Sequence, residues 1–300
     1  MVQFVSDVGS KYKQAVTPDT PSYAATGVRM EDSFCAFRGD GDLLLVVADG
    51  HGSTKVSDGV VVGGRECADA ACEAVRSASS HRDPIALFSK SQRAIRDKVV
   101  VPGQQRSAPD GVVRVRASSG DVELSVRGTT LSVCRVCPGR DSWFAWVGDS
   151  VGLLVRGDAV VVPLGTPHGT QNKAEALRVA RLGGKVDGKY FEFRTAGSKQ
   201  RIMLSRALGH VGHDTISKTP EVVHFVPYAG DKLVVATDGL WDCISVARAG
   251  QVVAAAATEA DACAALLEAY HSSKHPRDNV AIACHFVGGG EEGGCACAVQ

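Results

Sequence analysis

The sequence predicts an α+β fold in which helices pack outside a sandwich of two antiparallel sheets. Helical patterns and strand patterns occur in separate blocks along the chain instead of alternating one for one. Several apolar runs also have the length of a buried strand and end at turn residues. The 300 residues contain no internal repeat and no linker rich enough to divide them, so we expect a single domain.

Residues 1–27 are polar and turn-rich, which predicts a loose N-terminal arm (1–22) and a strand where it ends, at the start of a catalytic domain over 23–287. The apolar run 43–48 predicts the first strong strand. Helical spacing of apolar residues predicts a helix over 57–79. Asp83 and Pro84 supply an N-cap and a proline at the first helical position, so a second helix is expected over 84–100.

From 112 to 162 the pattern changes to short strands between glycine-containing turns. The strands expected there are 112–115, 122–126, 131–134, 143–147 and 153–155. The remaining elements expected are a helix over 173–182, strands over 222–226 and 233–236, helices over 244–256 and 259–271, and a last strand over 280–287. The glycine-rich segment 288–300 is expected to form a flexible tail.

Composition excludes several classes of protein. Charge is balanced at 33 basic against 33 acidic residues, which argues against a nucleic-acid-binding surface. The sequence has no run of about 20 apolar residues and no secretion signal at its start. Most of the ten cysteines lie in apolar patterns, including Cys134 and Cys137, and are expected to be buried thiols in a reducing, cytoplasmic compartment. Nothing in the pattern requires an oligomer, so we expect a monomer.

Four short acidic clusters carry the chemical information. They are Glu31-Asp32, Asp49-Gly50-His51-Gly52, Asp238-Gly239 and Asp278-Asn279. Two of them directly follow apolar strand patterns, so their carboxylates are expected at the mouth of a sheet, where they repel one another unless a cation neutralises them.

A ligand set made only of oxygen favours magnesium, manganese or calcium. Two such ions about 3.5–4 Å apart can bind a phosphoryl group and activate a water. His51 could protonate the leaving oxygen, since the usual pKa of histidine lies near neutrality. The isolated Asp-Gly pairs that begin at residues 58, 110 and 187 are interpreted as ordinary turns.

Seven segments in order resemble the type 2C protein phosphatases, the metal-dependent serine/threonine phosphatases. The matching segments are Met30-Glu31-Asp32, Val47-Ala48-Asp49-Gly50-His51-Gly52, Gly128-Thr129-Thr130, Val147-Gly148-Asp149-Ser150, Leu204-Ser205-Arg206-Ala207-Leu208-Gly209, Ala236-Thr237-Asp238-Gly239-Leu240-Trp241-Asp242 and Asp278-Asn279-Val280. Each segment alone is a weak signal, but seven in the family's order are highly specific.

The resemblance implies a central β-sandwich of two antiparallel sheets flanked by pairs of helices, with a centre for two Mg²⁺ or Mn²⁺ ions at one end. By the family's pattern, Asp49 would bridge both ions, Gly50 would bind one through its carbonyl, and Asp238 and Asp278 would complete the set. Glu31 would act directly or through water, with Asp32 close behind it. Asp149 would hold a weaker third ion together with Asp238, and His51 would be the general acid.

The implied reaction is hydrolysis of phosphoserine and phosphothreonine in proteins by direct attack of a water that bridges the two ions, without a phosphoenzyme. Two alternatives stay open. One is a pseudophosphatase, a regulatory binding module that keeps the fold without turnover. The other is a metal-dependent hydrolase of a small phosphorylated metabolite.

The chain departs from the family pattern at a few positions. Gly27 stands where the family usually has an arginine that grips the substrate phosphate. Arg29 lies on the same face of an extended strand and could reach the phosphate instead, or could be a solvated surface charge. His210 replaces a usual aspartate, Val151 replaces a usual arginine and Ser53 replaces a common glycine.

The last four residues, Cys297 to Gln300, fit the pattern for prenylation, and a terminal glutamine favours a farnesyl group. Cys295 could carry a second, reversible acyl chain, since a single lipid binds membranes only marginally. Membrane association is expected only through this lipidated tail, and a coincidental match to the short pattern is the competing interpretation.

Overall fold

The computed structural model describes residues 2–7, 30–52, 54–55, 61–99, 105–107, 113–117, 120–123, 127–195, 198–274 and 278–288. Arg29, Cys295 and Cys297 lie outside these ranges, so the predictions for the phosphate-gripping arginine and for lipidation stay predictions. Among the helices that are described, none combines the length and the apolar character that crossing a membrane requires.

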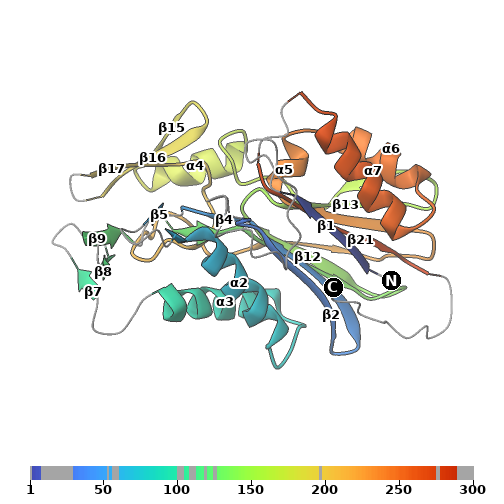
Figure 1. The fold of residues 1–300 in the computed structure, drawn as a ribbon, viewed down its shortest axis with the longest axis horizontal. Coiled ribbons are helices and arrows are strands. Elements are labelled where there is room, and N and C mark those ends of the chain that lie inside the picture. Colours follow the sequence, from blue (N-terminus) through green and yellow to red (C-terminus); the bar gives the residue numbers. More distant parts are fainter. Residues whose placement is uncertain are drawn as a thin grey trace.

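Two five-stranded antiparallel sheets form the centre of the molecule and confirm the predicted fold class (Figure 1). The first sheet has the order β19 (Glu221–Phe225), β12 (Ser142–Val147), β11 (Leu131–Val136), β3 (Asp42–Ala48) and β2 (Ser33–Gly39). The second has the order β1 (Val2–Asp7), β21 (Val280–Phe286), β20 (Lys232–Ala236), β13 (Val151–Val155) and β14 (Val161–Pro163).

Strand β3 shows why the sheets stack. All seven of its residues are buried, because each face of the strand is covered by a different layer. Leu43, Leu45 and Val47 pack between the sheets, together with residues of the second sheet such as Leu233 and Val235. An uninterrupted apolar strand therefore marks the middle of a layered structure.

The alternate residues of the two sheets face helices. Leu44, Val46 and Ala48 pack against α2 (Gly64–Arg76) and α3 (Pro84–Val99). On the other side of the molecule, α6 (Val246–Ala255) and α7 (Glu259–His271) cover the second sheet (Figure 1). The order helix, sheet, sheet, helix is the one that the family resemblance implied.

Smaller elements sit at one end of the sandwich. A three-stranded sheet has β10 (Gly128–Thr129) between β18 (Leu208–Gly209) and β4 (Gly50–His51). A second small sheet, of β15, β16 and β17, has α4 (Lys173–Arg181) beside it, and together they form a separate lobe (Figure 1). The other short elements are β5 (Thr54–Lys55), β6 (Val61–Val62), β7 (Gln105–Ser107), β8 (Val113–Ala117), β9 (Gly120–Glu123), β15 (Lys185–Asp187), β16 (Tyr190–Thr195), β17 (Ser198–Ile202) and α5 (Asp238–Trp241).

The structure differs from the sequence-based expectation in several places. Residues 2–7, expected in a loose arm, form β1 and pair with the last strand, β21. The helix expected over 57–79 is shorter, because residues 61–62 pair with 54–55 as a β-ribbon and α2 begins only at Gly64. Strands β2, β7 and β15 to β17 were not predicted. Strand β2 does contain a short apolar run, at 34–37, whereas the others are mixed sequences.

Candidate metal centre

Three of the predicted metal ligands come together at the end of the sandwich. Asp49 follows β3, Asp149 follows β12 and Asp238 follows β20. Each of these carboxylates places an oxygen within 4.8 Å of the other two, and all three residues are partly buried. Residues that are distant in sequence therefore converge because the strands that carry them end at the same edge.

The backbone around Asp49 is held on both sides. Thr130 Oγ1 accepts from the Asp49 amide at 2.9 Å, and Thr129 Oγ1 donates to the Asp49 carbonyl at 2.9 Å. Thr130 Oγ1 also shares a hydrogen bond of 2.7 Å with Ser150 Oγ, the residue after Asp149. One buried threonine thus couples the loop of Asp49 to the loop of Asp149.

Close backbone approaches require glycine at two positions of the site. A Cβ added to Gly50 would overlap the carbonyl oxygen of Gly64, at the start of α2. A Cβ added to Gly239 would overlap the carbonyl oxygen of Asn279. The first contact presses β4 onto the start of α2, and the second brings the Asp238 turn beside the Asp278 turn.

Hydrogen bonds with residues that are distant in the sequence hold Glu31 and Asp32 at the site. The Glu31 amide donates to Asn279 Oδ1 at 2.8 Å, and the Gly50 amide donates to the Glu31 carbonyl at 3.3 Å. Asp32 is only 1% exposed, and its Oδ2 accepts from Thr237 Oγ1 at 2.8 Å. Its Oδ1 is buried without a hydrogen-bond partner among the described residues, as is Asp149 Oδ1.

Asp278 lies at the rim and is exposed. The backbone fixes its place: the Asn279 amide donates to its Oδ1 at 2.9 Å, and the Tyr270 hydroxyl donates to its carbonyl at 2.7 Å. Its carboxylate stands apart from the close group of three, but its charge raises the pKa values of Asp49, Asp149 and Asp238.

Burial and mutual repulsion disturb the ionisation of the whole cluster. Burial is the largest cause for each carboxyl, and it raises the pKa of Asp32 and of Asp149 to about 7. The pKa values of Asp49 and Asp238 lie well above the usual range, because the charges of Asp238 and Asp149, respectively, add to the effect of burial. Carboxyls that resist ionisation together are the expected signature of a site built around cations.

The donor set therefore fits hard divalent cations. All of the candidate ligands are carboxylate or carbonyl oxygens, and two buried carboxylate oxygens lack any other described partner. Magnesium and manganese prefer such oxygen ligands, whereas zinc and copper favour nitrogen and sulfur.

His51 lies beside this cluster and faces a second histidine. Its Nε2 is 2.8 Å from Nε2 of His210, and the ring centroids are 5.0 Å apart. Burial lowers the pKa of His51 to about 4, although the Asp49 carbonyl opposes the shift. Substrate-free His51 is therefore neutral at physiological pH.

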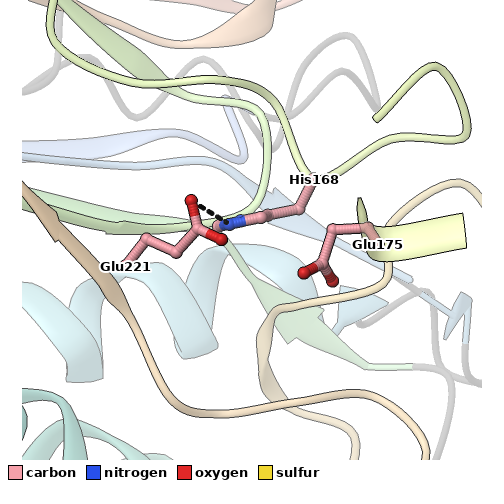
Figure 2. Close-up of side chains that lie close together, drawn as sticks. All are labelled: His168, Glu175 and Glu221. Atoms are coloured by element: carbon pink, nitrogen blue, oxygen red, sulfur yellow. Dashed lines mark ion pairs between the residues drawn. The ribbon is translucent and has the colours of Figure 1, made fainter. Parts of the chain in front are cut away.

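A second group of potential metal ligands consists of His168, Glu175 and Glu221 (Figure 2). The Gly148 amide donates to His168 Nδ1 at 2.9 Å, so the hydrogen of the neutral ring must be on Nε2. That hydrogen points towards Glu221 Oε2, 3.7 Å away, and leaves no lone pair for a metal. Burial, reinforced by the charge of Arg206, lowers the pKa of His168 to about 3, so the ring is neutral.

Glu175 is also unsuited to bind a metal, because its oxygens are already occupied. Oε2 accepts from Arg178 at 2.9 Å, and Oε1 accepts from Arg206 at 2.6 Å. Ser205 Oγ donates to Oε2 as well, at 2.5 Å. We interpret this group as a structural ion network that ties α4 to the chain before β18.

Sequence reasoning missed several residues that shape the site. Thr130, Thr237 and Asn279 lie inside the matching segments, but nothing in the sequence signalled their hydrogen bonds to acidic residues. His210 attracted notice only as a departure from the family pattern. Its contact with His51 joins residues 159 positions apart, which only the folded chain can show.

An antiparallel sandwich with carboxylates gathered at one end defines an α+β protein with a candidate centre for divalent cations. The family described as Protein phosphatase 2C matches residues 44–280, more than half of the chain. The chain belongs to this family.

Curated relatives cover part of the chain. Probable protein phosphatase 2C 12 of Oryza sativa subsp. japonica is 28% identical over 176 residues, which are 54% of this chain and 44% of the rice protein. Protein phosphatase 2C homolog 2 of Aspergillus fumigatus is 34% identical over 138 residues, 41% of this chain and 29% of the fungal protein. The matches thus span less than half the length of these relatives.

Solved structures support the fold. The Mycobacterium tuberculosis serine/threonine phosphatase PstP/Ppp aligns with a TM-score of 0.58 at 18% identity, over 96% of this chain and 99% of that chain. The catalytic domain of PstP in complex with two manganese ions has a TM-score of 0.58 at 18% identity, over 96% and 98% of the two chains. At this identity the likeness shows the fold alone.

Proposed function

We propose that this protein is a Mg²⁺- or Mn²⁺-dependent phosphatase that hydrolyses phosphoserine and phosphothreonine in proteins. The observation that carries the proposal is the convergence of Asp49, Asp149 and Asp238 within 4.8 Å of one another. Membership of the Protein phosphatase 2C family supports it. So does the structural neighbour that is in complex with two manganese ions, the catalytic domain of PstP.

In this proposal the cations are held by Asp49, Asp238, Asp278 and the Gly50 carbonyl, with Glu31 acting directly or through water. Asp149 and Asp238 are the pair available to a third, weaker ion. When bound, the cations supply charge neutralisation for the substrate phosphate and make a water acidic enough to act as nucleophile.

The chain's own residues then hold this arrangement in place. Thr130 fixes the backbone of Asp49, and Thr237 holds Asp32 behind the ligands. Because these partners are buried and rigid, the carboxylates need little reorganisation when cations and substrate arrive.

His51 supplies the proton. It gives a proton to the oxygen of the departing serine or threonine, a poor leaving group that is expelled as an alcohol. The negative charge of the substrate phosphate must raise the affinity of the His51 ring for a proton above that of the buried, substrate-free state. Arg29 is the proposed contact to the phosphate, in place of an arginine at residue 27.

The test is turnover of a phosphothreonine peptide by the purified chain, with and without manganese. We expect manganese-dependent release of phosphate. Asp238→Asn should lower the rate on the order of 10³-fold or more, since it removes a charge from the ligand set. Asp97→Asn, an exposed change on α3, is the matched control and should keep the rate.

Two measurements on the purified chain distinguish the proposed phosphatase from the pseudophosphatase alternative. The glycine at residue 27, in place of an arginine, favours that alternative. Calorimetric titration with manganese would show cation binding in both cases. Binding without turnover of any phosphopeptide would favour the regulatory module, and turnover of small phosphorylated metabolites alone would favour the metabolite hydrolase.

A further inference from the structure

Charge is distributed unevenly over this chain, although its total is balanced. The lobe formed by α4 and by β15 to β17 spans residues 172–203 (Figure 1) and holds eight basic against three acidic residues. The rest of the chain holds 25 basic against 30 acidic residues. The lobe is therefore a positively charged unit attached to a negatively charged body.

The positive charge lies on the surface of the lobe. Of its three acidic side chains, Glu175 and Glu192 are buried, and Asp187 is exposed. Among the described side chains of the lobe, five basic ones are exposed: Lys173, Arg181, Lys185, Lys189 and Arg201. The surface that a partner would meet is thus more basic than the composition of the lobe alone suggests.

Two of these cations gather around one aromatic ring. Arg201 Cζ lies 4.4 Å from the centre of the Tyr190 ring, and Lys189 Nζ lies 5.6 Å from it. An ion pair of 3.1 Å joins Arg201 to Asp187, which lies opposite Tyr190 in the sheet. Two cations beside one exposed carboxylate keep donors for acceptors on a partner, because each carries several N–H groups.

The two ends of the lobe meet beside a candidate metal ligand. His168, in the segment that enters α4, accepts from the Gly148 amide and donates its own amide to the Gly148 carbonyl, each at 2.9 Å. The amide of Ser205, in the segment that leaves β17, donates to the His168 carbonyl at 3.0 Å. Because Gly148 directly precedes Asp149, the lobe is attached to the body at the candidate metal centre.

The turn between β15 and β16 also lies near this centre. Partial burial and the charge of Asp278 raise the pKa of Asp242, and the nearby charge of Lys189 opposes the rise. Asp242 closes the turn of Asp238, since its amide donates to the Asp238 carbonyl at 2.8 Å. A peptide whose phosphate reaches the centre would carry its flanking residues past Lys189.

The lobe exposes apolar side chains as well as charge. Seven large hydrophobic side chains are exposed among the described residues, and four of them belong to the lobe: Leu177, Leu182, Val186 and Met203. Exposed apolar groups next to cations favour a polypeptide partner, because a polypeptide can supply both carboxylates and apolar side chains.

We propose that the lobe of residues 172–203 is a specificity surface that selects phosphoserine and phosphothreonine segments flanked by acidic residues. Aspartate or glutamate beside the phosphorylated residue pairs with exposed cations such as Lys189 and Arg201. Lysine or arginine at the same places is repelled, so charge complementarity discriminates between substrates. The inference rests on the proposed function for the place of the phosphate, but selection by charge can be measured without turnover.

The first test measures binding. Two fluorescent peptides carry a non-hydrolysable phosphonate analogue of phosphothreonine and differ only in its flanking residues, which are aspartate in one and lysine in the other. By fluorescence anisotropy with the magnesium-loaded protein, we expect the aspartate peptide to bind about tenfold more tightly at low salt. Added salt should reduce the difference, since it screens exposed charges.

The outcomes of this test separate the inference from the proposed function. Equal affinities, or no measurable binding of the aspartate peptide, overturn the inference whether or not the protein is a phosphatase. A charge preference in binding without turnover of either hydrolysable peptide would count against the phosphatase and leave the selection by charge supported.

The second test locates the selection on the lobe. Lys189→Gln combined with Arg201→Gln should weaken binding of the aspartate peptide about fivefold or more, and should not weaken binding of the lysine peptide. The matched control is Arg96→Gln combined with Arg248→Gln, which removes the same charge from exposed positions on α3 and α6. Equal weakening by both pairs would show that only net charge matters, and would overturn the inference.

A charge-conserving pair guards against misfolding. Lys189→Arg combined with Arg201→Lys keeps both cations and should keep the preference, and melting temperatures show which variants are folded. With hydrolysable peptides, the loss in the glutamine pair should appear mainly in KM, because the cations bind flanking residues and not the reacting phosphate. Binding to vesicles of phosphatidylcholine and phosphatidylserine that depends on Lys189 and Arg201, without a preference between the peptides, would assign the surface to a membrane and overturn the inference.

Discussion

At the residue scale, the site depends on a backbone contact that only glycine permits. The Gly50 Cα lies against the Gly64 carbonyl, where α2 begins. Gly50 is also the residue whose own carbonyl is proposed to bind a cation. One glycine therefore sets both the packing of the helix and the direction of a proposed ligand.

We predict that Gly50→Ala damages stability and activity together. The added methyl group must displace backbone on both sides, a change that costs about 1–3 kcal/mol of folding free energy. Activity with manganese should fall more than the melting temperature alone explains, because the carbonyl moves with its residue. The measurements are thermal unfolding and the manganese dependence of peptide turnover.

Gly169→Ala is the matched control. A Cβ there meets no atom within 4 Å, so the change should leave both quantities nearly unaltered. If Gly50→Ala behaved like Gly169→Ala, the close contact between β4 and α2 would not exist in solution.

At the element scale, Glu175 connects α4 to the main body of the protein. Asn172 caps the helix by accepting from the amides of Ala174 and Glu175. The Glu175 side chain then receives Arg178 from its own helix and Arg206 from the segment before β18. Although burial opposes ionisation, the hydrogen bonds from Arg206, Ser205 and Arg178 lower the pKa of Glu175 to about 2.

We predict that Glu175→Gln destabilises the protein by about 3–5 kcal/mol, because it leaves two arginines without their buried counter-charge. The exposed Glu268→Gln change on α7 should stay within about 0.5 kcal/mol of the unchanged protein. Denaturant unfolding of the magnesium-loaded proteins measures both values. Equal stability of the two variants would mean that the network contributes nothing.

Some elements could be predicted from sequence because local signals coincided with their burial. Asp83 caps the helix at 84–99 by accepting from two amides of its first turn, and Thr258 caps the helix at 259–271. Strand β3 is an unbroken apolar run over 43–48. Strand β1 could not be predicted in the same way, since its place depends on pairing with β21, almost the whole chain away. Local patterns do not contain such long-range pairings.

At the scale of the whole molecule, one part of the candidate site was predictable from the sequence and another part was not. Asp49 and Asp238 were predictable, because each follows a recognisable buried strand and the two strands end together. The supporting hydrogen bonds of Asp32 and the meeting of His51 with His210 were not, because they join segments whose approach the sandwich alone determines. Candidate ligands were thus predictable from sequence, whereas the hydrogen bonds that hold them required the fold.

The sandwich also brings like charges together, and this has a consequence for stability. In the metal-free protein the pKa values of Asp32 and Asp149 are raised to about 7, so the folded state binds protons that the unfolded chain has released. Raised carboxyl pKa values stabilise the folded state at low pH, and this contribution is lost as pH rises through the folded value. Bound cations remove this loss, because they keep the carboxylates ionised without repulsion.

We therefore predict that chelation lowers the melting temperature, and that the difference from the magnesium-loaded protein grows between about pH 5 and pH 8. Each carboxyl contributes a slope of at most about 1.4 kcal/mol per pH unit within that window. Asp149→Asn should flatten the pH dependence of the metal-free protein, whereas the exposed Asp97→Asn change should not. The measurement is thermal unfolding across this pH range. It is made on the unchanged protein in chelator and in magnesium, and on each variant in chelator. A metal-free melting temperature that stayed level or rose with pH would show that the carboxylates do not repel one another in the folded protein, and the case for a cation centre at this end of the sandwich would fail with it.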